Sequence, residues 1–284
     1  MPILSKASVD EFDSPVERLL ASIANLSQQP TSKGAHFYRT SLRRFQAWCD
    51  VFHPALDLRQ KQALKFLDKL RRNTGKLRDS EVHLDLLAQL PGADADEKKK
   101  LEKALRSRSS VYERKLKSHL RKPILTGIWR TLRSLDAPPP GTDQLATFHP
   151  IKGMNTLALD EYCAFVQRHG PVSPENLHEY RLECKRFRYT AELAGKTPEG
   201  EVLIERWKKV QDTIGEWHDY LTLSELAEEV LGESSLLATL QQLTRKKYTE
   251  SRRAVAETER RLIPQPALKK KPQRATGSRR SRAA

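Results

Sequence analysis

The sequence predicts an all-α protein built from two related halves. Three observations support this fold class. Apolar residues recur at helical spacing along most of the 284 residues. Strand-like alternation bounded by hairpin turns is absent from the sequence. A motif rich in histidine and arginine occurs twice, once on each side of the helix-breaking stretch DAPPPGT at 136–142.

Caps and apolar spacing assign the helices in order. Ser14-Pro15-Val16-Glu17 combines a capping residue, a proline at the first helical position and an acid three places later, which predicts a helix from there to about Asn25. We expect further helices over about 31–53, 58–74, 77–90, 95–121 and 124–135, and then over 155–169, 174–195, 199–213, 217–231 and 235–262. Ser173-Pro174-Glu175 and Thr197-Pro198-Glu199 are typical helix starts.

These elements divide the chain into five segments. They are a flexible N-terminus (1–11), a first helical half (12–136), a Pro-rich connector (137–142), a second helical half (143–262) and a disordered basic tail (263–284). The tail has no acid and no apolar periodicity, which is typical of disorder. Its cations are Lys269, Lys270, Lys271, Arg274, Arg279, Arg280 and Arg282.

Charge and cysteine content limit the function classes. The formal net charge is +15 and the isoelectric point is about 9.8, so the first expectation is an anionic partner. The three cysteines show neither close pairing nor metal-type spacing, which favours free thiols in a reducing compartment. The sequence has no apolar run of signal-peptide or membrane-span length, so we expect a cytoplasmic protein.

The repeat is specific enough to align without a gap. HFYRTSLRRF (36–45) matches HEYRLECKRF (178–187), and a second pair of segments about thirty residues later matches Gly75 with Gly215 and Asp79 with Asp219. We interpret the two glycines as helix-to-helix turns, each followed four residues later by an aspartate that caps a helix or pairs with an arginine.

In each copy, a histidine, an arginine three later and an arginine or lysine seven later project from one helix face. Two such helices facing each other across a groove or pore would bind a multivalent anion, because arginine donates bidentately to phosphate oxygens and lysine supplies a point charge. A solvated surface is the alternative interpretation for either basic stripe taken alone.

We expect Phe45 and Phe187, with Leu42 and Leu182, in the core. The motif leaves Tyr38 and Tyr180 open between groove and core.

The candidate anion-binding residues extend beyond the repeated motif to neighbouring helices. They are His36, Arg39, Arg43, Arg44, Lys65, Lys69, Arg72, Arg106, Lys115, His178, Arg181, Lys185, Arg186, Arg188, Lys208, Lys209, Arg245 and Arg252. The sequence contains no Gly-rich phosphate loop, no H-E-x-x-H, no C-x-x-C and no nucleophile elbow. We therefore predict no catalytic residue, no metal, no cofactor and no enzymatic activity.

These motifs resemble the CHAD family, the conserved histidine α-helical domain, over roughly residues 12 to 262. The resemblance implies two antiparallel four-helix bundles with pseudo-two-fold symmetry and a basic channel between them. It also implies binding of inorganic polyphosphate, often at polyphosphate granules.

Many relatives carry a triphosphate-tunnel domain ahead of this one. Only about a dozen residues precede the first helix here, which favours a stand-alone binder. The alternative partner is nucleic acid, RNA above all, bound by the same groove and the tail. Polyphosphate is favoured over RNA because the basic rows lack interleaved exposed aromatics.

Overall fold

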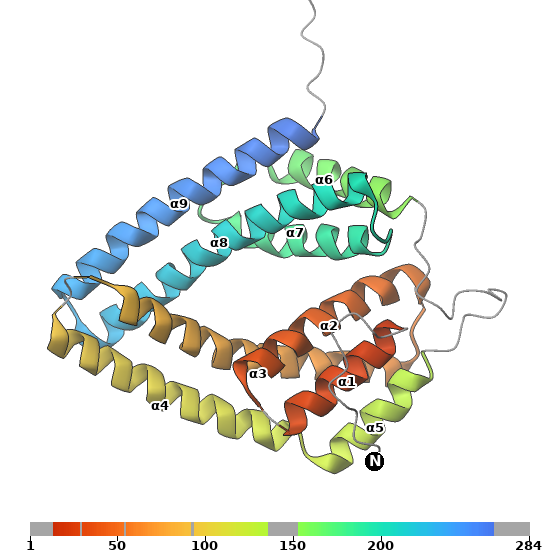
Figure 1. Cartoon of the computed structure of the whole chain (residues 1–284), viewed down its shortest axis with the longest axis horizontal. Coiled ribbons are helices and arrows are strands. Elements are labelled where there is room, and N and C mark those ends of the chain that lie inside the picture. Colours follow the sequence, from red (N-terminus) through yellow and green to blue (C-terminus); the bar gives the residue numbers. More distant parts are fainter. Residues whose placement is uncertain (1–13, 29, 54, 92–93, 136–152, 264–284) are drawn as a thin grey trace, which may run out of the picture.

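The computed structural model describes residues 14–28, 30–53, 55–91, 94–135 and 153–263, and no strand occurs in these ranges. The all-α class is confirmed. The helices are α1 (Pro15–Gln28), α2 (Ser32–Phe52), α3 (Leu58–Gln89), α4 (Ala95–His119), α5 (Lys122–Arg133), α6 (Met154–His169), α7 (Leu177–Glu192), α8 (Pro198–Leu231) and α9 (Ser235–Leu262) (Figure 1). The predicted N-terminus, the connector and nearly all of the tail lie outside the described residues.

Helices α3 and α8 run without interruption through the two glycines that we interpreted as turns. Gly75 lies inside α3 and Gly215 inside α8, so the predicted breaks near 75 and 215 are wrong. Neither glycine has a positive φ. A glycine inside a helix costs only about 1 kcal/mol relative to alanine. Both glycines are buried against neighbouring helices, and that packing offsets a cost of this size.

Two of the three predicted helix starts are confirmed. Helix α1 begins at Pro15, and the Ser14 hydroxyl accepts from the Glu17 N–H at 3.0 Å. Helix α8 begins at Pro198, capped by Thr197. Helix α7 starts at Leu177, three residues later than predicted, because the Ser173 N–H donates to Asn176 Oδ1 (2.8 Å) and the segment forms a turn before the helix.

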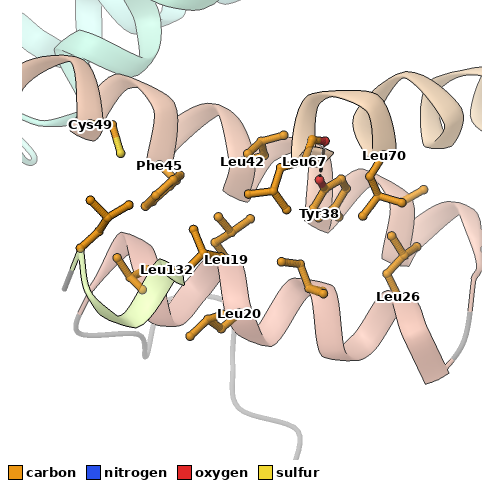
Figure 2. Close-up of a cluster of buried hydrophobic side chains, with 14 of the residues drawn as sticks. Leu19, Leu20, Leu26, Tyr38, Leu42, Phe45, Cys49, Leu67, Leu70 and Leu132 are labelled. Carbon is orange, nitrogen blue, oxygen red and sulfur yellow. Dashed lines mark hydrogen bonds between the residues drawn. The ribbon is translucent and has the colours of Figure 1, made fainter. Parts of the chain in front are cut away.

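Each half of the molecule has its own hydrophobic core. In the first half, leucines of α1, α3 and α5 surround Tyr38, Leu42 and Phe45 of α2 (Figure 2). The Tyr38 hydroxyl donates to the Leu67 carbonyl at 2.7 Å. In the second half, α6 to α9 bury an aromatic group made of Tyr162, Phe165, Tyr180, Phe187 and Trp207. Tyr38 and Tyr180 are thus core residues.

The predicted core positions Phe45, Phe187 and Leu42 are confirmed as buried. The prediction for Leu182 is wrong, because this side chain is 37% exposed. The buried face of α7 contains Tyr180 and Cys184, and a residue two places from Tyr180 points about 200° round the helix.

Within the described residues, apolar side chains of the two halves pack together in two places. Near the middle of the molecule, Ala47 of α2 packs in one small cluster with Tyr189 and Leu193 of the α7 end. At the far ends of the long helices, leucines of α3 and α4 form a shared core with leucines of α8 and α9. Figure 1 shows the α3–α4 and α8–α9 pairs converging at these ends. The apolar residues of the distal contact are Leu87, Leu90, Leu101, Leu105, Leu223, Leu226, Ala227, Leu236, Leu237 and Leu240.

Candidate anion-binding site

A group of cations occupies the region where α2, α3 and α7 approach one another, next to α8. We call this group the basic cluster. Each arginine of the group lowers the pKa of at least one other member, and four of them lower the pKa of Lys185, so the seven groups lie within electrostatic reach of one another. The members are Arg39 and Arg43 of α2, Arg71 and Arg78 of α3, and Arg181, Lys185 and Arg188 of α7.

The position of the cluster follows from the two contacts between the halves. Along α2 and α7 the cluster residues come just before the apolar contact of Ala47 and Tyr189. Along α3 they come before the distal contact, where His83 Nε2 lies 3.0 Å from Thr222 Oγ1 of α8. The two contacts therefore hold the cluster between the halves, one on each side.

Arg39 reaches from α2 to the backbone of α3. Its Nη1 donates to the Arg71 carbonyl at 3.2 Å. Burial is the main cause that lowers the pKa of Arg39, to about 10, while nearby Asp79 opposes the shift. Arg39 therefore keeps its charge at neutral pH although it is half-buried.

Two cluster residues of α7, Arg181 and Lys185, have few hydrogen-bond or ion-pair partners in the described structure. The Nε of Arg181 is buried and has no hydrogen-bond partner among the residues that the structure describes. Lys185 is half-buried, forms no ion pair within that part of the chain, and faces Arg181 and Arg39. Burial and these guanidinium groups lower the pKa of Lys185 to about 6. Both side chains are strongly desolvated donors.

The carboxylates near the cluster do not balance it. Asp68 forms ion pairs with Arg71 (2.7 Å) and with Arg72 (3.0 Å). Asp79 and Asp219 act on Arg181 from α3 and α8. Burial raises the pKa of Asp219 to about 6 against the effect of Arg181. Asp212 also acts on Arg181, and Glu192 Oε1 lies 3.4 Å from Arg188 Nε. Six guanidinium groups and the Lys185 amine face these five acids, of which Asp68 and Glu192 are shared with Arg72 and Arg44 outside the cluster. Like charges held this close are costly without a compensating anion.

The two motif histidines flank the cluster and are exposed. Partial burial and then neighbouring cations lower their pKa values, with Arg78 and Arg39 acting on His36 and Arg181 acting on His178. The His178 ring lies 5.7 Å from the His218 ring of α8. An anion here would reverse these shifts and turn the histidines into additional donors.

Arg44 and Arg186, although part of the repeated motif, form ion pairs with glutamates. Glu192, the partner of Arg44, also lies 3.4 Å from Arg188 of the cluster. Arg44 Nε lies 2.6 Å from Glu192 of α7, which links the two halves. Arg186 lies 2.8 Å from both Glu161 and Glu183. In the structure, both arginines therefore act in ion pairs between helices.

The structure leaves the other nine predicted cations exposed instead of placing them in the half-buried cluster. Several have local partners, such as Glu102 for Arg106 (2.7 Å) and Glu257 for Lys209 (3.1 Å). The nine exposed residues are Lys65, Lys69, Arg72, Arg106, Lys115, Lys208, Lys209, Arg245 and Arg252.

Sequence reasoning missed Arg71, Arg78 and His218 as site residues. The signal that identifies the two arginines is Gly75, because residues four before and three after it share its helix face. The same relation places His218 on the face of Gly215.

A cavity of about 260 Å³ lies beside the cluster between α3, α4 and α8. It shares Asp79 with the cluster's surroundings and is also lined by Lys76, Arg108 and Glu229. Arg108 and Glu229 pair with each other at 2.6 Å. This mixed charge distinguishes the cavity from the basic cluster.

The described part of the chain shows neither a metal-binding group nor a membrane-spanning helix. Within 14–135 and 153–263, excluding the short gaps, no group of three His, Cys, Asp or Glu residues is arranged to hold a metal ion. None of the helices described has both the length and the apolar character needed to cross a membrane.

A family model described as the CHAD domain matches residues 12–228. Among solved structures, PptA from Streptomyces chartreusis matches with a TM-score of 0.56 and 14% identity, covering 87% of this chain and 96% of that one. The CHAD domain from the plant Ricinus communis matches with a TM-score of 0.51 and 16% identity, covering 88% and 84%. At these identities the two structures support the fold alone. No curated protein matches the sequence significantly.

Proposed function

This chain belongs to the CHAD family, and we propose that its basic cluster binds inorganic polyphosphate without breaking it down. The observation that carries the proposal is the crowding of six guanidinium groups and the Lys185 amine between the halves, with the buried Arg181 Nε lacking a hydrogen-bond partner among the described residues. A phosphate chain supplies what this arrangement lacks, namely repeated negative charge and oxygen acceptors.

The arrangement of the cluster favours a polymer over a single phosphate. Cations come from α2 and α3 of the first half and from α7 of the second. A chain with one charge per unit engages both groups at once, and it gains affinity by releasing counterions along its length.

The surroundings of the cluster favour polyphosphate over RNA. Single-stranded RNA binding uses exposed aromatic rings on which bases stack. In the described ranges every Phe, Tyr and Trp is buried or half-buried. Tyr189, the ring nearest to Arg188, is only 5% exposed, and the guanidinium of Arg188 lies over it at 4.4 Å.

Competition between the two polymers tests the choice of ligand. Long-chain polyphosphate and single-stranded RNA are titrated at equal phosphate concentration and at several salt concentrations. We expect polyphosphate to displace RNA at each of them. Displacement of polyphosphate by RNA would assign the site to nucleic acid.

A charge-matched pair of variants tests the location. Arg39→Glu with Arg181→Glu changes the net charge by the same amount as Lys65→Glu with Lys69→Glu, but only the first pair lies in the cluster. We expect the first variant to lose binding and the second to bind within about threefold of the wild type, the scale of a screened surface charge. Both should retain helical circular dichroism. Equal losses would show that only net charge matters.

The proposal also covers catalysis and location. Incubation with polyphosphate and Mg²⁺ should release no phosphate, and steady release would contradict the non-catalytic function. We propose a cytoplasmic protein that associates with polyphosphate granules. A fluorescent fusion should then colocalise with the granules, and the variant with both Arg39→Glu and Arg181→Glu should be diffuse.

A further inference from the structure

We propose that Gly75 positions Arg39 for anion binding, and that Gly215, its counterpart in the aligned repeat, has no such role toward Arg181. The inference rests on the proposed function, since it concerns the same site. It assigns different tasks to two glycines that the sequence presents as equivalents.

The space beside the two glycines differs. A Cβ atom on Gly75 would overlap with Nη1 of Arg39, and it would lie 3.5 Å from Cζ of that guanidinium. A Cβ atom on Gly215 would meet Nε and Nη2 of Arg181 at 3.6 Å, which is ordinary van der Waals contact. The Arg39 guanidinium therefore occupies the volume that any other residue at 75 would fill.

The missing side chain exposes the backbone of α3 to Arg39. The Arg71 carbonyl, four residues before Gly75, accepts from Arg39 Nη1 at 3.2 Å and from the Thr74 hydroxyl at 2.8 Å. This bond holds the guanidinium in reach of Arg78 on α3 and of Arg181 in the other half. It uses one of the five guanidinium N–H donors, so the others stay available to a phosphate. Arg181 has no matching backbone bond, and its buried Nε has no partner in the described structure.

If Gly75 were needed only for the packing of α3, replacing it with alanine would lower the stability of the protein. The obstacle to a larger residue is the end of a flexible side chain, not the backbone of a neighbouring helix. Alanine at position 75 therefore leaves α3 intact, and a Gly→Ala change inside a helix normally stabilises it. Stability and binding should consequently respond in opposite directions.

The experiment compares Gly75→Ala with the matched control Gly215→Ala. We expect both proteins to melt at or above the wild-type temperature. Polyphosphate affinity should fall about tenfold in Gly75→Ala, the scale of one charge-assisted hydrogen bond, and stay within about twofold in Gly215→Ala. Equal affinities for the two variants would overturn the inference.

A double-mutant cycle shows whether the effect passes through Arg39. In an Arg39→Ala background, Gly75→Ala should cause no further loss of affinity, and a full additional tenfold loss would contradict the positioning role. In ligand-free protein, the NMR signal of the Arg39 Nε–H should shift in Gly75→Ala, and an unchanged signal would refute the displacement. A wild type that binds no polyphosphate would overturn the proposed function itself. Wild-type binding that is unaffected by Gly75→Ala would overturn only this inference.

Discussion

Lys185 is the residue at which the electrostatic cost of the cluster is concentrated. It faces Arg39 and Arg43 from α2 and Arg181 and Arg188 from its own helix. Burial and these four guanidinium groups lower the pKa of its ammonium to about 6, so the amine is mostly neutral at pH 7. A bound polyanion would stabilise the charged form and raise this pKa.

We therefore expect polyphosphate binding to take up protons above pH 6. Below the free pKa of about 6, Lys185 is charged with or without ligand and contributes its full attraction. As the pH rises from 6 toward the higher pKa of the bound state, binding must supply the proton, and affinity falls. Asp219, with a pKa of about 6, and His178, with a lowered pKa, change in the same direction. Calorimetry in two non-phosphate buffers of different ionisation enthalpy measures the number of protons.

Lys185→Arg provides the control, because arginine stays charged throughout this range. On binding polyphosphate at pH 7.5, the variant should take up as much as one proton fewer per site than the wild type. Its affinity should also depend less steeply on pH. An unchanged proton count would mean that Lys185 is already charged in the free protein.

The sequence predicts five of the seven cluster members, all of them on α2 and α7, and it does so for a physical reason. Arg39 and Arg181 come from a repeated face, and repetition fixes the phase of a helix without knowledge of its partners. On α3 no repeat of cations was available, and the stripe of Lys65 and Lys69 competed with the face of Arg71 and Arg78. Choosing between these two faces of α3 requires knowing where α2 packs, which only the tertiary structure gives.

Each site helix presents separate faces to separate partners. On α7, Tyr180 and Phe187 point into the core, whereas Arg181, Lys185 and Arg188 recur at the i, i+4 and i+7 spacing of one face. Arg186 lies about 140° from Arg181 and binds Glu161 and Glu183 of the same half. The helix thus separates a binding face from a stabilising one.

This division predicts opposite effects for two neighbouring arginines. Arg186→Gln should lower the free energy of unfolding by about 1 kcal/mol, because two half-buried ion pairs are lost, and leave polyphosphate affinity within about twofold. Arg181→Gln should reduce affinity at least tenfold without lowering stability, since it removes one of several crowded like charges. Urea unfolding and titration with polyphosphate measure the two quantities. Loss of affinity in Arg186→Gln would place Arg186 in the site.

The long helices show where local reasoning fails at the scale of an element. Caps marked the starts at Pro15 and Pro198, because a cap is a local hydrogen-bonding requirement. The neighbouring sequence does not explain why glycine occurs at 75 and 215, because the side chains that lie against these two positions come from α2 and α7. Interpreting Gly75 as a turn also restarted the helical phase after it, which hid the alignment of Arg71 with Arg78.

At the scale of the whole molecule, the halves must stay together for the cluster to exist. The Arg44–Glu192 ion pair and the Ala47 contact join them at α2 and α7. The distal leucines, with Arg108–Glu229 alongside, join them at the tips of the long helices. Affinity is therefore a property of the assembled chain, and the duplication that the sequence predicts would explain why each half supplies part of the site.

Salt dependence separates this assembled site from the overall charge of the protein. Each phosphate neutralised on a single-stranded polyanion contributes about −0.7 to the slope of log affinity against log salt. If the cluster makes four to seven contacts, the slope of the wild type should lie at about −3 to −5.

Deleting residues 265–284 removes seven cations and no acid, which lowers the net charge from +15 to +8. We expect this truncated protein to bind only about threefold more weakly at 0.15 M salt, with a slope changed by less than about one, because dispersed charges beyond the Debye length are screened. Arg39→Glu with Arg181→Glu changes the charge by only four, yet it should remove most of the slope and most of the affinity. The reverse ranking, with the larger loss on truncation, would move the binding site from the basic cluster to the tail.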